Sequence, residues 1–403
     1  MLITVLYFCG MKYFYGLLLI PFFLVSCLQK PMLSGDLDIS QAEGLKPMVY
    51  LVQPENFDQL GQSFVGKLLD SAEVDGRGHF QFEALKNVEG QVLLEVVVQK
   101  KGERYANRLE NENPDSDNYM PLIWTRGETL VINAAIDQFQ SSVTIENPST
   151  VNASFLELRD LKKNAFLKYK NSLELLQGDE QLLEREKALH EYQAILMQFA
   201  DATPELFPAL MAIKWVSPEG NYERIPEFLV NQGVKWSERY PNDRWVKELA
   251  ALASKEKLPI LVGDQMSNLE FPMVDGSKTS LNAITDGKKL LVLDVWASWC
   301  APCRLENRNV LLPLWQKYHD QGFQVIAYAL ESNRPAWENA IQKDGANRWL
   351  HASHLEGDQN PIMDSLRIHT IPANFILDGN GKVLAKNLHG EDLVQFVANY
   401  LGD

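Results

Sequence analysis

The sequence predicts an α/β domain at its C-terminal end, preceded by an antiparallel β domain and a helical middle region. Short apolar runs between turn residues predict strands near the N-terminus, and apolar residues spaced by three and four predict helices in the middle. Runs of both kinds alternate in the last third, which is typical of a layered α/β fold. A length of 403 residues suits two or three domains.

The composition is that of an ordinary globular chain, with 46% hydrophobic and 23% charged residues. Acidic residues (53) outnumber basic ones (38), which gives a formal net charge of −15. Because nucleic-acid affinity depends on Lys and Arg neutralising phosphates, this balance argues against nucleic acid as a partner. The 4 cysteines are too few for a fold held together by disulfides.

Residues 1–26 predict a secretory signal peptide. They carry one charge, Lys12, ahead of an apolar run from Tyr13 to Val25. This run is short for a membrane span, which needs about 20 residues. We expect Met11 to be the initiator, which would leave Cys9 outside the protein.

The apolar run ends at Leu24-Val25-Ser26-Cys27. This segment resembles a bacterial lipobox, whose cysteine receives lipid and becomes the mature N-terminus. The resemblance implies a lipid anchor at Cys27 and a membrane lipoprotein of the cell envelope that faces the periplasm. A plain signal peptide that contains a cysteine and an uncleaved anchor remain as alternatives.

Residues 33–150 are predicted to form a sandwich-like or barrel-like antiparallel β domain. Gly76-Arg77-Gly78 has no helix after it, so it is predicted to be a hairpin turn rather than a phosphate-binding loop. The expected strands are Met48–Val52, Ser63–Leu69, His79–Phe82, Val92–Val98, Leu122–Trp124, Leu130–Ile136 and Ser142–Ile145.

Residues 151–255 are predicted to be a helical linker domain. Apolar residues at positions 158, 161, 165, 169, 173 and 176 follow the helical period, and Leu183 to Phe199 continues in the same style. Prolines divide shorter helices after that, and the last helix lies near Trp245–Ser254. The charged residues of this region are expected to form a solvated face.

Residues 256–403 are predicted to be the α/β domain, after a linker at Lys255–Pro259. The expected strands are Lys289–Trp296, Phe323–Leu330, Asn374–Leu377 and Lys382–Leu388. The expected helices are Pro302–Tyr318, Ala336–Lys343 and Glu391–Leu401.

Cys300 and Cys303 are the candidate catalytic residues, because they stand where a buried strand gives way to a helix. Unpaired N–H groups and the helix dipole favour the thiolate of a cysteine at a helix N-terminus. That thiolate can attack a disulfide in a partner, and the second cysteine, one turn further on, can then resolve the mixed disulfide. Pro302 suits the first helical turn because it has no N–H to leave unpaired.

A metal site is the alternative reading of the cysteine pair. Zinc sites need four ligands, and no second Cys-x-x-Cys exists. The histidines that could complete such a site are more simply explained as solvent-facing or structural. They are His351, His354, His369 and His389.

The C-terminal domain resembles the thioredoxin superfamily, and within it the membrane-attached TlpA/ResA-like thiol–disulfide oxidoreductases. Two motifs carry the resemblance: Asp294-Val-Trp-Ala-Ser-Trp-Cys-Ala-Pro-Cys303 and Thr370-Ile-Pro-Ala-Asn-Phe-Ile-Leu-Asp378. The distance between them is longer than in plain thioredoxin and is similar to the group with an insertion between the halves. The resemblance implies a thioredoxin-like fold and an enzyme that needs no cofactor and no metal.

The resemblance also implies roles for individual residues. Cys300 matches the exposed nucleophile, Cys303 the resolving cysteine, and Pro372 the cis-proline that faces the pair and shapes the groove for a partner's backbone. Asp294 matches a buried acid that exchanges a proton with Cys303. The alternative for Asp294 is a strand-end acid paired to a lysine such as Lys289.

Glu306 matches an acid found three residues after the second cysteine, and its alternative is an exposed helix carboxylate. The group carries a proline two residues after that acid, where this sequence has Arg308, so the helix path at this point is open. Trp299 is expected to pack beside the pair and limit solvent, and Trp296 to lie in the core.

The residues between the cysteines bear on the direction of electron flow. Strong oxidants of the superfamily place a histidine there, whereas this chain has Ala301-Pro302, and Ile371 before Pro372 is the thioredoxin-like choice. Both features favour a reductant. An oxidase or isomerase with the same site, and an envelope binding or scaffold protein, are the alternatives.

The front half resembles, more loosely, the β domain that precedes thioredoxin domains in lipoproteins of Bacteroidota. The resemblance rests on the Gly35-Asp-Leu-Asp start, the Asp70–Phe80 hairpin and the Gly127–Ile132 run. We therefore expect residues 33–255 to bind or position a partner. The expected partners are disulfide-containing envelope proteins and a thiol protein that donates electrons from the membrane.

Overall fold

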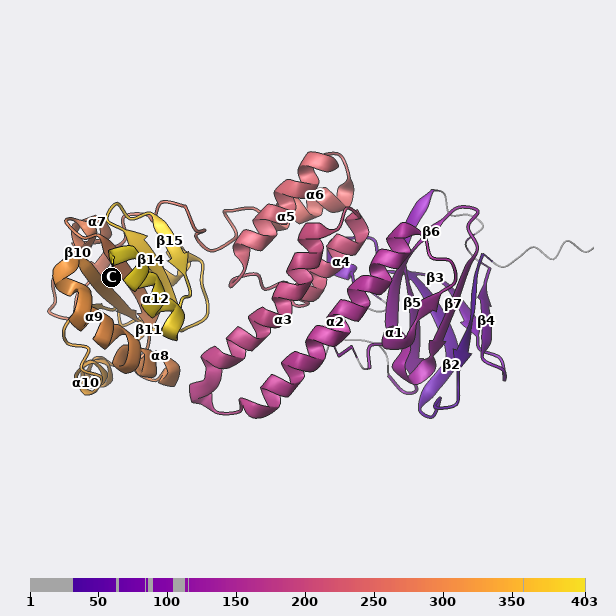
Figure 1. Ribbon diagram of the computed structural model, residues 1–403, viewed down its shortest axis with the longest axis horizontal. Coiled ribbons are helices and arrows are strands. Elements are labelled where there is room, and N and C mark those ends of the chain that lie inside the picture. Colours follow the sequence, from indigo (N-terminus) through magenta and orange to yellow (C-terminus); the bar gives the residue numbers. More distant parts are fainter. Residues whose placement is uncertain are drawn as a thin grey trace, which may run out of the picture.

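The computed structural model describes residues 32–402 except 63–64, 84, 86–89, 104–112, 115 and 358. The β region, the helical region and the C-terminal α/β domain follow one another along the longest axis of the molecule (Figure 1). The predicted signal peptide and Cys27 lie outside the described residues. No helix in the described part of the chain is long and apolar enough to cross a membrane.

The β region consists of two four-stranded sheets, with strand orders β4-β1-β7-β8 and β3-β2-β5-β6. Strand β5 is buried at every position except its two ends, because it is an inner strand of its sheet and the helical region covers that sheet. The strands are β1 (Leu33–Asp38), β2 (Leu45–Gln53), β3 (Lys67–Glu73), β4 (His79–Phe82), β5 (Gln91–Lys100), β6 (Tyr119–Thr125), β7 (Leu130–Ala135) and β8 (Thr144–Ile145).

Most strand pairs in this region are antiparallel, as predicted, but β1 and β7 pair in parallel. Strand β1 was not among the predicted strands, because Gly35, Asp36 and Asp38 break its apolar pattern. Position 35 requires glycine, because the Cβ of any other residue would lie 1.8 Å from the Ile132 carbonyl oxygen. The predicted turn is confirmed at residues 75–78, where the Gly78 N–H donates to the Asp75 carbonyl oxygen. The strands that it joins, β3 and β4, belong to different sheets, so they do not pair as the predicted hairpin.

The helical region begins with a long hairpin, formed by α2 (Thr150–Leu175) and α3 (Leu182–Ala202) (Figure 1). Ser149 caps α2 by accepting a hydrogen bond from the Asn152 N–H. Three shorter helices follow: α4 (Leu206–Val216), α5 (Pro226–Arg239) and α6 (Arg244–Leu252). The apolar side of the hairpin packs against the β region, and one hydrophobic core runs through both from Leu33 to Leu258.

A buried ion pair ties the hairpin to the β region. Lys162 Nζ lies 2.8 Å from Asp117 Oδ2, and both side chains are about 1% exposed. Gln140 and the Trp215 ring also face the ammonium. The charge is thus fully surrounded by protein partners, so removal of either member leaves the other without compensation.

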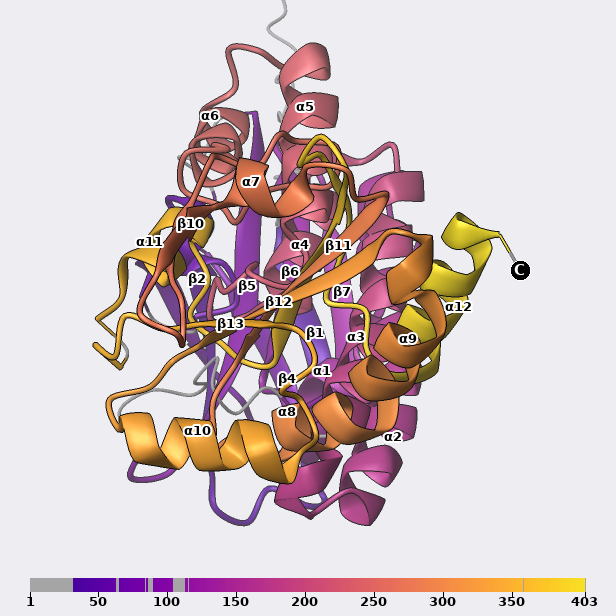
Figure 2. The ribbon, with the colours of Figure 1, turned by 90° about the vertical axis from the view of Figure 1, so that its left-hand side faces the viewer.

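The C-terminal domain has its own core, which starts at Ile260. Its five-stranded sheet has the order β13-β12-β11-β14-β15. In Figure 2, β11 and β12 run diagonally across the view, with α10 below them and α9 and α12 to their right. The strands are β11 (Leu290–Trp296), β12 (Phe323–Ala329), β13 (Leu350–Ala352), β14 (Ala373–Asp378) and β15 (Val383–Lys386), with a separate pair, β9 (Glu270–Pro272) and β10 (Lys278–Ser280). The helices are α7 (Leu281–Thr285), α8 (Ala301–Glu306), α9 (Leu312–Tyr318), α10 (Arg334–Lys343), α11 (Pro361–Leu366) and α12 (Gly390–Leu401).

Strand β11 is the centre of this sheet. All seven of its residues are buried, it pairs in parallel with β12, and it pairs antiparallel with β14. A strand covered on both faces reads as a continuous apolar run, which is why the sequence predicted it well. Trp296, at its C-terminal end, lies in the core as expected.

We expect Lys162→Met to lower the free energy of unfolding by about 3–5 kcal/mol, because the Asp117 carboxylate would stay buried without its cation. Denaturant unfolding of the whole chain measures the change. Lys170→Met, at an exposed position of the same helix, is the control and should change stability by less than about 0.5 kcal/mol. Equal effects of the two substitutions would contradict the importance of the buried pair.

Candidate active site

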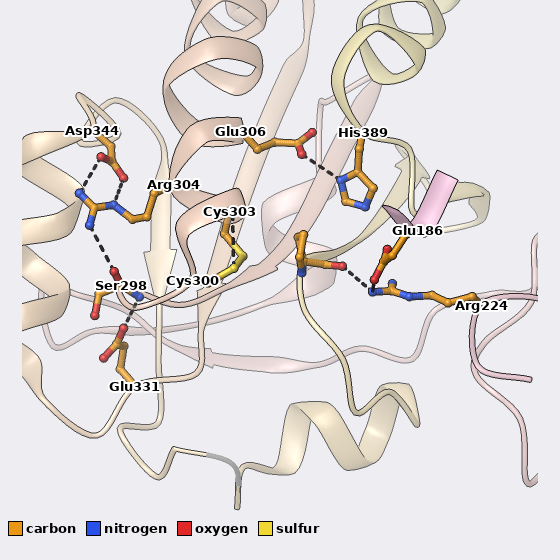
Figure 3. The surroundings of a disulfide bond; sticks show 11 residues. Glu186, Arg224, Ser298, Cys300, Cys303, Arg304, Glu306, Glu331, Asp344 and His389 are labelled. Carbon is orange, nitrogen blue, oxygen red and sulfur yellow. Dashed lines mark hydrogen bonds and ion pairs between the residues drawn. A yellow bond between two sulfur atoms is a disulfide. The ribbon is translucent and has the colours of Figure 1, made fainter. Parts of the chain in front are cut away.

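Cys300 and Cys303 form a disulfide at the start of α8, directly after the C-terminal end of β11 (Figure 3). Cys300 is the N-cap residue, and its Sγ accepts a hydrogen bond from the Cys303 N–H at 3.3 Å. Pro302 occupies the first turn. The same N–H points at the sulfur that becomes the thiolate when the bond is reduced, so the helix start favours the ionised form of Cys300.

The expected exposure of Cys300 is wrong for this oxidised state. Cys300 is 5% exposed and Cys303 is 3% exposed. The sulfur of Cys300 turns inward to its partner. In addition, the turn Asp179–Gln181 at the tip of the α2–α3 hairpin packs against α8. The helical region therefore contributes to the surroundings of the disulfide.

Trp299 does not pack beside the pair as expected, because its residue is 65% exposed. Trp299 lies in the turn between β11 and α8 and is exposed to solvent, whereas the next residue, Cys300, is buried. The ring is a large exposed apolar surface next to the candidate nucleophile. It cannot shield the disulfide, but it is available to a partner.

Asp294 lies on β11 and is buried, and within the described residues Lys289 is not among the groups that shift the pKa of its carboxyl. Burial raises the pKa of its carboxyl well above the ordinary value, and the nearby Glu306 carboxylate raises it further. Asp294 is thus kept protonated to higher pH than a surface carboxyl, which suits a group that exchanges protons near neutral pH.

Glu306 is not an exposed helix carboxylate, because it is 5% exposed. Its Oε2 lies 2.9 Å from His389 Nδ1 (Figure 3). Its Oε1 accepts a hydrogen bond from the Gly390 N–H at 3.2 Å. The start of α12 therefore holds this carboxylate in place. Glu306 thus acts on the buried Asp294 carboxyl and is itself bound by His389.

The helix after the cysteines departs from the α conformation where the sequence departs from the family pattern. Residues Asn307–Leu311 form a π-helical turn, and Arg308 lies within it. Arg304 and Arg308 both bind Asp344, whose side chain is fully buried. Arg304 also donates to the Ser298 carbonyl oxygen at 3.2 Å. The two arginines anchor the disulfide helix to the end of α10.

The loop before α8 has a further anchor. The Ser298 N–H donates a hydrogen bond to Glu331, which is 3% exposed and follows β12. The loop is thus fixed from both sides, by Glu331 and by Arg304 (Figure 3). This restricts the direction from which Cys300 can be approached.

The Ile371–Pro372 peptide bond is cis, as expected from the second motif. Two consecutive residues of the helical region bind this loop. Glu223 accepts hydrogen bonds from the His369 and Thr370 N–H groups, and Arg224 donates to the Pro372 carbonyl oxygen at 2.8 Å. The cis-proline loop is therefore held by a part of the chain outside the α/β domain.

A cleft of about 1070 Å³ opens between the helical region and the C-terminal domain. Its lining includes Glu223 and Arg224, which bind the cis-proline loop, Thr370 of that loop, and His389, the partner of Glu306. Phe166, Tyr169 and Tyr192, whose rings contact one another, and Trp215 contribute aromatic surface further along α2, α3 and α4.

The histidines do not form a metal site. Within the described ranges, no group of three His, Cys, Asp or Glu residues could hold an ion. His351 is buried and bonds through Nε2 to the Ala346 carbonyl oxygen, and burial lowers its pKa to about 4. His354 bonds to the Tyr328 hydroxyl. These contacts support the structural reading of both residues.

Sequence reasoning missed the residues that hold the site from a distance. Glu223, Arg224, Glu331 and Asp344 lie in no motif, and only the fold brings them to the cysteines. His389 was considered only as a weak metal ligand or a structural residue. Its spacing from Glu306 carries no signal, because 83 residues separate them.

A family model described as Redoxin matches residues 261–400. This stretch contains the disulfide, the buried acid and the cis-proline. The C-terminal domain is a thioredoxin-superfamily domain of the TlpA-like type. Residues 1–260 lie outside the match.

Characterised relatives give this domain its enzyme class. The chain is 26% identical over 149 residues to "Thiol-disulfide oxidoreductase ResA" of Bacillus anthracis, covering 37% of this chain and 80% of the relative. It is 27% identical over 135 residues to "Thiol:disulfide interchange protein DsbE" of Escherichia coli K12, covering 33% of this chain and 67% of the relative. The TlpA-like domain is thus a thiol–disulfide oxidoreductase of the ResA/DsbE type.

Solved structures cover the same third of the chain. The C-terminal domain of a putative thiol-disulfide oxidoreductase from Bacteroides thetaiotaomicron is 26% identical and matches 35% of this chain and 96% of that domain, with a TM-score of 0.33. A thiol-disulfide oxidoreductase from Bacteroides fragilis is 28% identical and matches 34% of this chain and 98% of its own, with a TM-score of 0.31.

We expect Asp294→Asn to remove a pH dependence of stability. A carboxyl whose pKa is raised on folding stabilises the protein fully below its unfolded pKa, and that contribution is lost as pH rises through the folded pKa. The wild-type free energy of unfolding should therefore fall from acidic to alkaline pH by about 1.4 kcal/mol for each unit by which the pKa is raised. Asp294→Asn should lack this fall.

The measurement is denaturant unfolding of the oxidised chain at a series of pH values. Asp364→Asn, at an exposed position of α11, is the control and should retain the wild-type profile. A profile of Asp294→Asn that equals the wild type would show that Asp294 is ionised at neutral pH.

Proposed function

We propose that this chain is a lipid-anchored thiol–disulfide oxidoreductase of the cell envelope that reduces disulfides in partner proteins through Cys300 and Cys303. The observation that carries the proposal is the cysteine pair at the start of α8, which lies in one domain with the buried Asp294, whose carboxyl has a raised pKa. Other residues bear on the direction of electron flow, on the access of a partner to the cysteines, and on the location of the protein in the cell.

In the proposed reaction, the reduced enzyme begins with a Cys300 thiolate and a Cys303 thiol. The thiolate attacks one sulfur of the partner disulfide, a mixed disulfide forms, and the other partner sulfur leaves as a thiolate. Cys303 then loses its proton and attacks Cys300 Sγ. This step releases the second partner sulfur and forms the Cys300–Cys303 disulfide. Two electrons pass to the partner, whose sulfurs take up two protons.

Asp294 is the proposed base for the second step. Its raised pKa comes from burial and from the neighbouring Glu306 carboxylate, which brings it closer to the pKa of a thiol. We propose that Glu306 acts on Asp294, and that His389 holds Glu306 through the contact with Nδ1. Pro302, Ile371 and Pro372 shape the surface beside the sulfurs, and Trp299 offers a ring to the partner.

The reducing direction rests on the residues around the pair. Ala301 and Pro302 place no charge and no side-chain donor beside Cys300, so nothing from them adds to the stability of the reduced form. A redox potential near that of thioredoxin, about −270 mV, follows, rather than that of a strong oxidant, about −120 mV. Since the proposed compartment is oxidising, the reductant needs electrons from a membrane thiol protein.

The anchor and the division of the chain belong to the same proposal. The lipobox-like segment ending at Cys27 would tether the protein to the membrane, and removal of residues 1–26 would make Cys27 the N-terminus. Residues 33–150 and 151–255 would then stand between the anchor and the redox domain at 256–403. We propose that they position the redox domain and its partners.

We expect the Cys300–Cys303 pair to equilibrate with glutathione at a potential near −270 mV. The measurement is the fraction of reduced protein across a series of glutathione ratios, read by thiol alkylation and mass spectrometry. A potential above about −180 mV, the region of disulfide isomerase, would reject the reducing direction and favour an oxidase or isomerase.

The scaffold alternative is tested in the Cys303→Ala chain, which cannot resolve a mixed disulfide. The reductase proposal requires covalent adducts through Cys300 that disappear on addition of dithiothreitol. The same chain with Cys300→Ala is the control. No adducts with any envelope protein would favour a binding or scaffold role.

We expect Cys27→Ser to release the protein from the membrane fraction of cells that express the full chain, and to abolish incorporation of a labelled fatty acid. Cys303→Ser, a cysteine substitution far from the N-terminus, is the matched control and should change neither result. A Cys27→Ser chain that is still labelled would contradict a lipid anchor at this residue.

A further inference from the structure

The cis-proline loop receives hydrogen bonds from the helical region on both sides of Ile371. On one side, Glu223 Oε1 accepts from the Thr370 N–H at 3.1 Å and from the Thr370 hydroxyl at 2.6 Å, and Oε2 accepts from the His369 N–H at 2.9 Å. Glu223 is 9% exposed. A buried carboxylate with three donors fixes the backbone of residues 369–370 firmly, because charge-assisted hydrogen bonds are the stronger ones.

On the other side, Arg224 fixes the residue after Ile371. Its Nη2 donates to the Pro372 carbonyl oxygen at 2.8 Å, and its Nη1 donates to Asn387 Oδ1 at 2.9 Å. Glu186 of α3 lies 3.4 Å from Nη2 and keeps the guanidinium in place. The planar fork of Arg224 thus joins two loops of the C-terminal domain, which a lysine ammonium could not do with the same geometry.

Ile371 itself is left open. Its backbone N–H and C=O have no hydrogen-bond partner among the described residues, although both of its neighbours are held. Strand β14 begins only at Ala373, and Ile371 is half-buried. An unpaired N–H and C=O beside a rigid backbone form a short edge to which an extended polypeptide can add by main-chain hydrogen bonds.

We propose that Glu223 and Arg224 are positioning residues for the disulfide-exchange reaction: they fix the Ile371 backbone so that a partner's polypeptide chain binds beside Cys300. The proposal rests on the proposed function and assigns part of the redox site to the helical region. The cleft is lined by Glu223, Arg224 and Thr370, so the pair faces space that a partner can enter.

Glu223 and Arg224 fix the Ile371 backbone before a partner binds, so less conformational entropy is lost when the partner binds. Substitution of either residue should therefore weaken the binding of a peptide and leave the rate of thiol–disulfide exchange between the bound sulfurs unchanged. A substrate that has no peptide backbone should gain little from the fixed Ile371 backbone. The two classes of substrate therefore separate positioning of a partner from general support of the fold.

The test uses the full chain with Cys303→Ala, which stops at the mixed disulfide whichever way electrons normally flow. The probes are a disulfide-linked dimer of an extended, single-cysteine peptide, and cystamine, a disulfide without a peptide backbone. Adduct formation is followed at increasing probe concentration, which gives a half-saturating concentration and a limiting rate for the peptide. The readout is the ratio of the second-order rate constants for peptide and cystamine.

We expect Arg224→Gln and Glu223→Gln each to lower this ratio about tenfold, chiefly by raising the half-saturating peptide concentration. Arg224→Lys should restore part of it, because an ammonium can still donate to the Pro372 oxygen. The matched control is Arg239→Gln. Arg239 also donates to a main-chain carbonyl oxygen, that of Pro204, but lies away from the redox loop.

Three outcomes would overturn the proposal. The first is a ratio in the Glu223 and Arg224 variants equal to that of the parent. The second is an equal fall for both probes, which would indicate a merely structural role. The third is a parent chain that forms an adduct with cystamine but none with the peptide. In contrast, a redox potential of the Cys300–Cys303 pair above about −180 mV would reject the proposed reducing direction only. It would not affect the conclusion drawn from the ratio of the peptide and cystamine rate constants.

Discussion

The full burial of strand β11 is the constraint on which the redox site depends. Both faces and both edges of the strand are covered, so its position in the sheet is fixed. The position of its C-terminal end is therefore fixed as well. The chain must turn there, and Cys300 caps the helix that follows. Asp294, two residues before the end of the strand, shares the burial that raises the pKa of its carboxyl. One packed strand therefore sets both the position of the sulfurs and the protonation of the acid in the same domain.

The helical region acts on this site in addition to joining two domains. Its hairpin rests on the β region through a shared hydrophobic core and the buried Lys162–Asp117 pair, which gives it a fixed base. The far end of the hairpin packs against α8, and the loop before α5 binds the cis-proline loop through Glu223 and Arg224. Residues that no redox motif contains thus determine what surrounds the cysteines.

The sequence was informative wherever a local pattern decides the structure. The apolar run of β11, the cysteine pair and the Ile371–Pro372 motif were all predicted at the right places, since each depends on neighbouring residues. The exposure of Trp299 and of Cys300 was mispredicted, because exposure depends on which distant segments cover a loop. The contacts of Glu223 with His369 and Thr370 span almost 150 residues, and single-sequence patterns contain no information at that separation. Strand β1 was not predicted because its polar residues hide the apolar pattern of a strand. It is an inner strand of its sheet because it pairs with β4 on one side and with β7 on the other, and these pairings cannot be read from its own sequence.

The two hydrophobic cores meet at the chain segment between Leu258 and Ile260 but do not merge. Among the described residues, hydrogen bonds and ion pairs cross the boundary, such as those of Lys386 with Glu227 and of Arg224 with the Pro372 carbonyl oxygen. Water can take over every such bond when it opens, whereas a merged core would have exposed apolar surface. The boundary is therefore the place where the two halves can move apart at the lowest cost, because no apolar core has to open there.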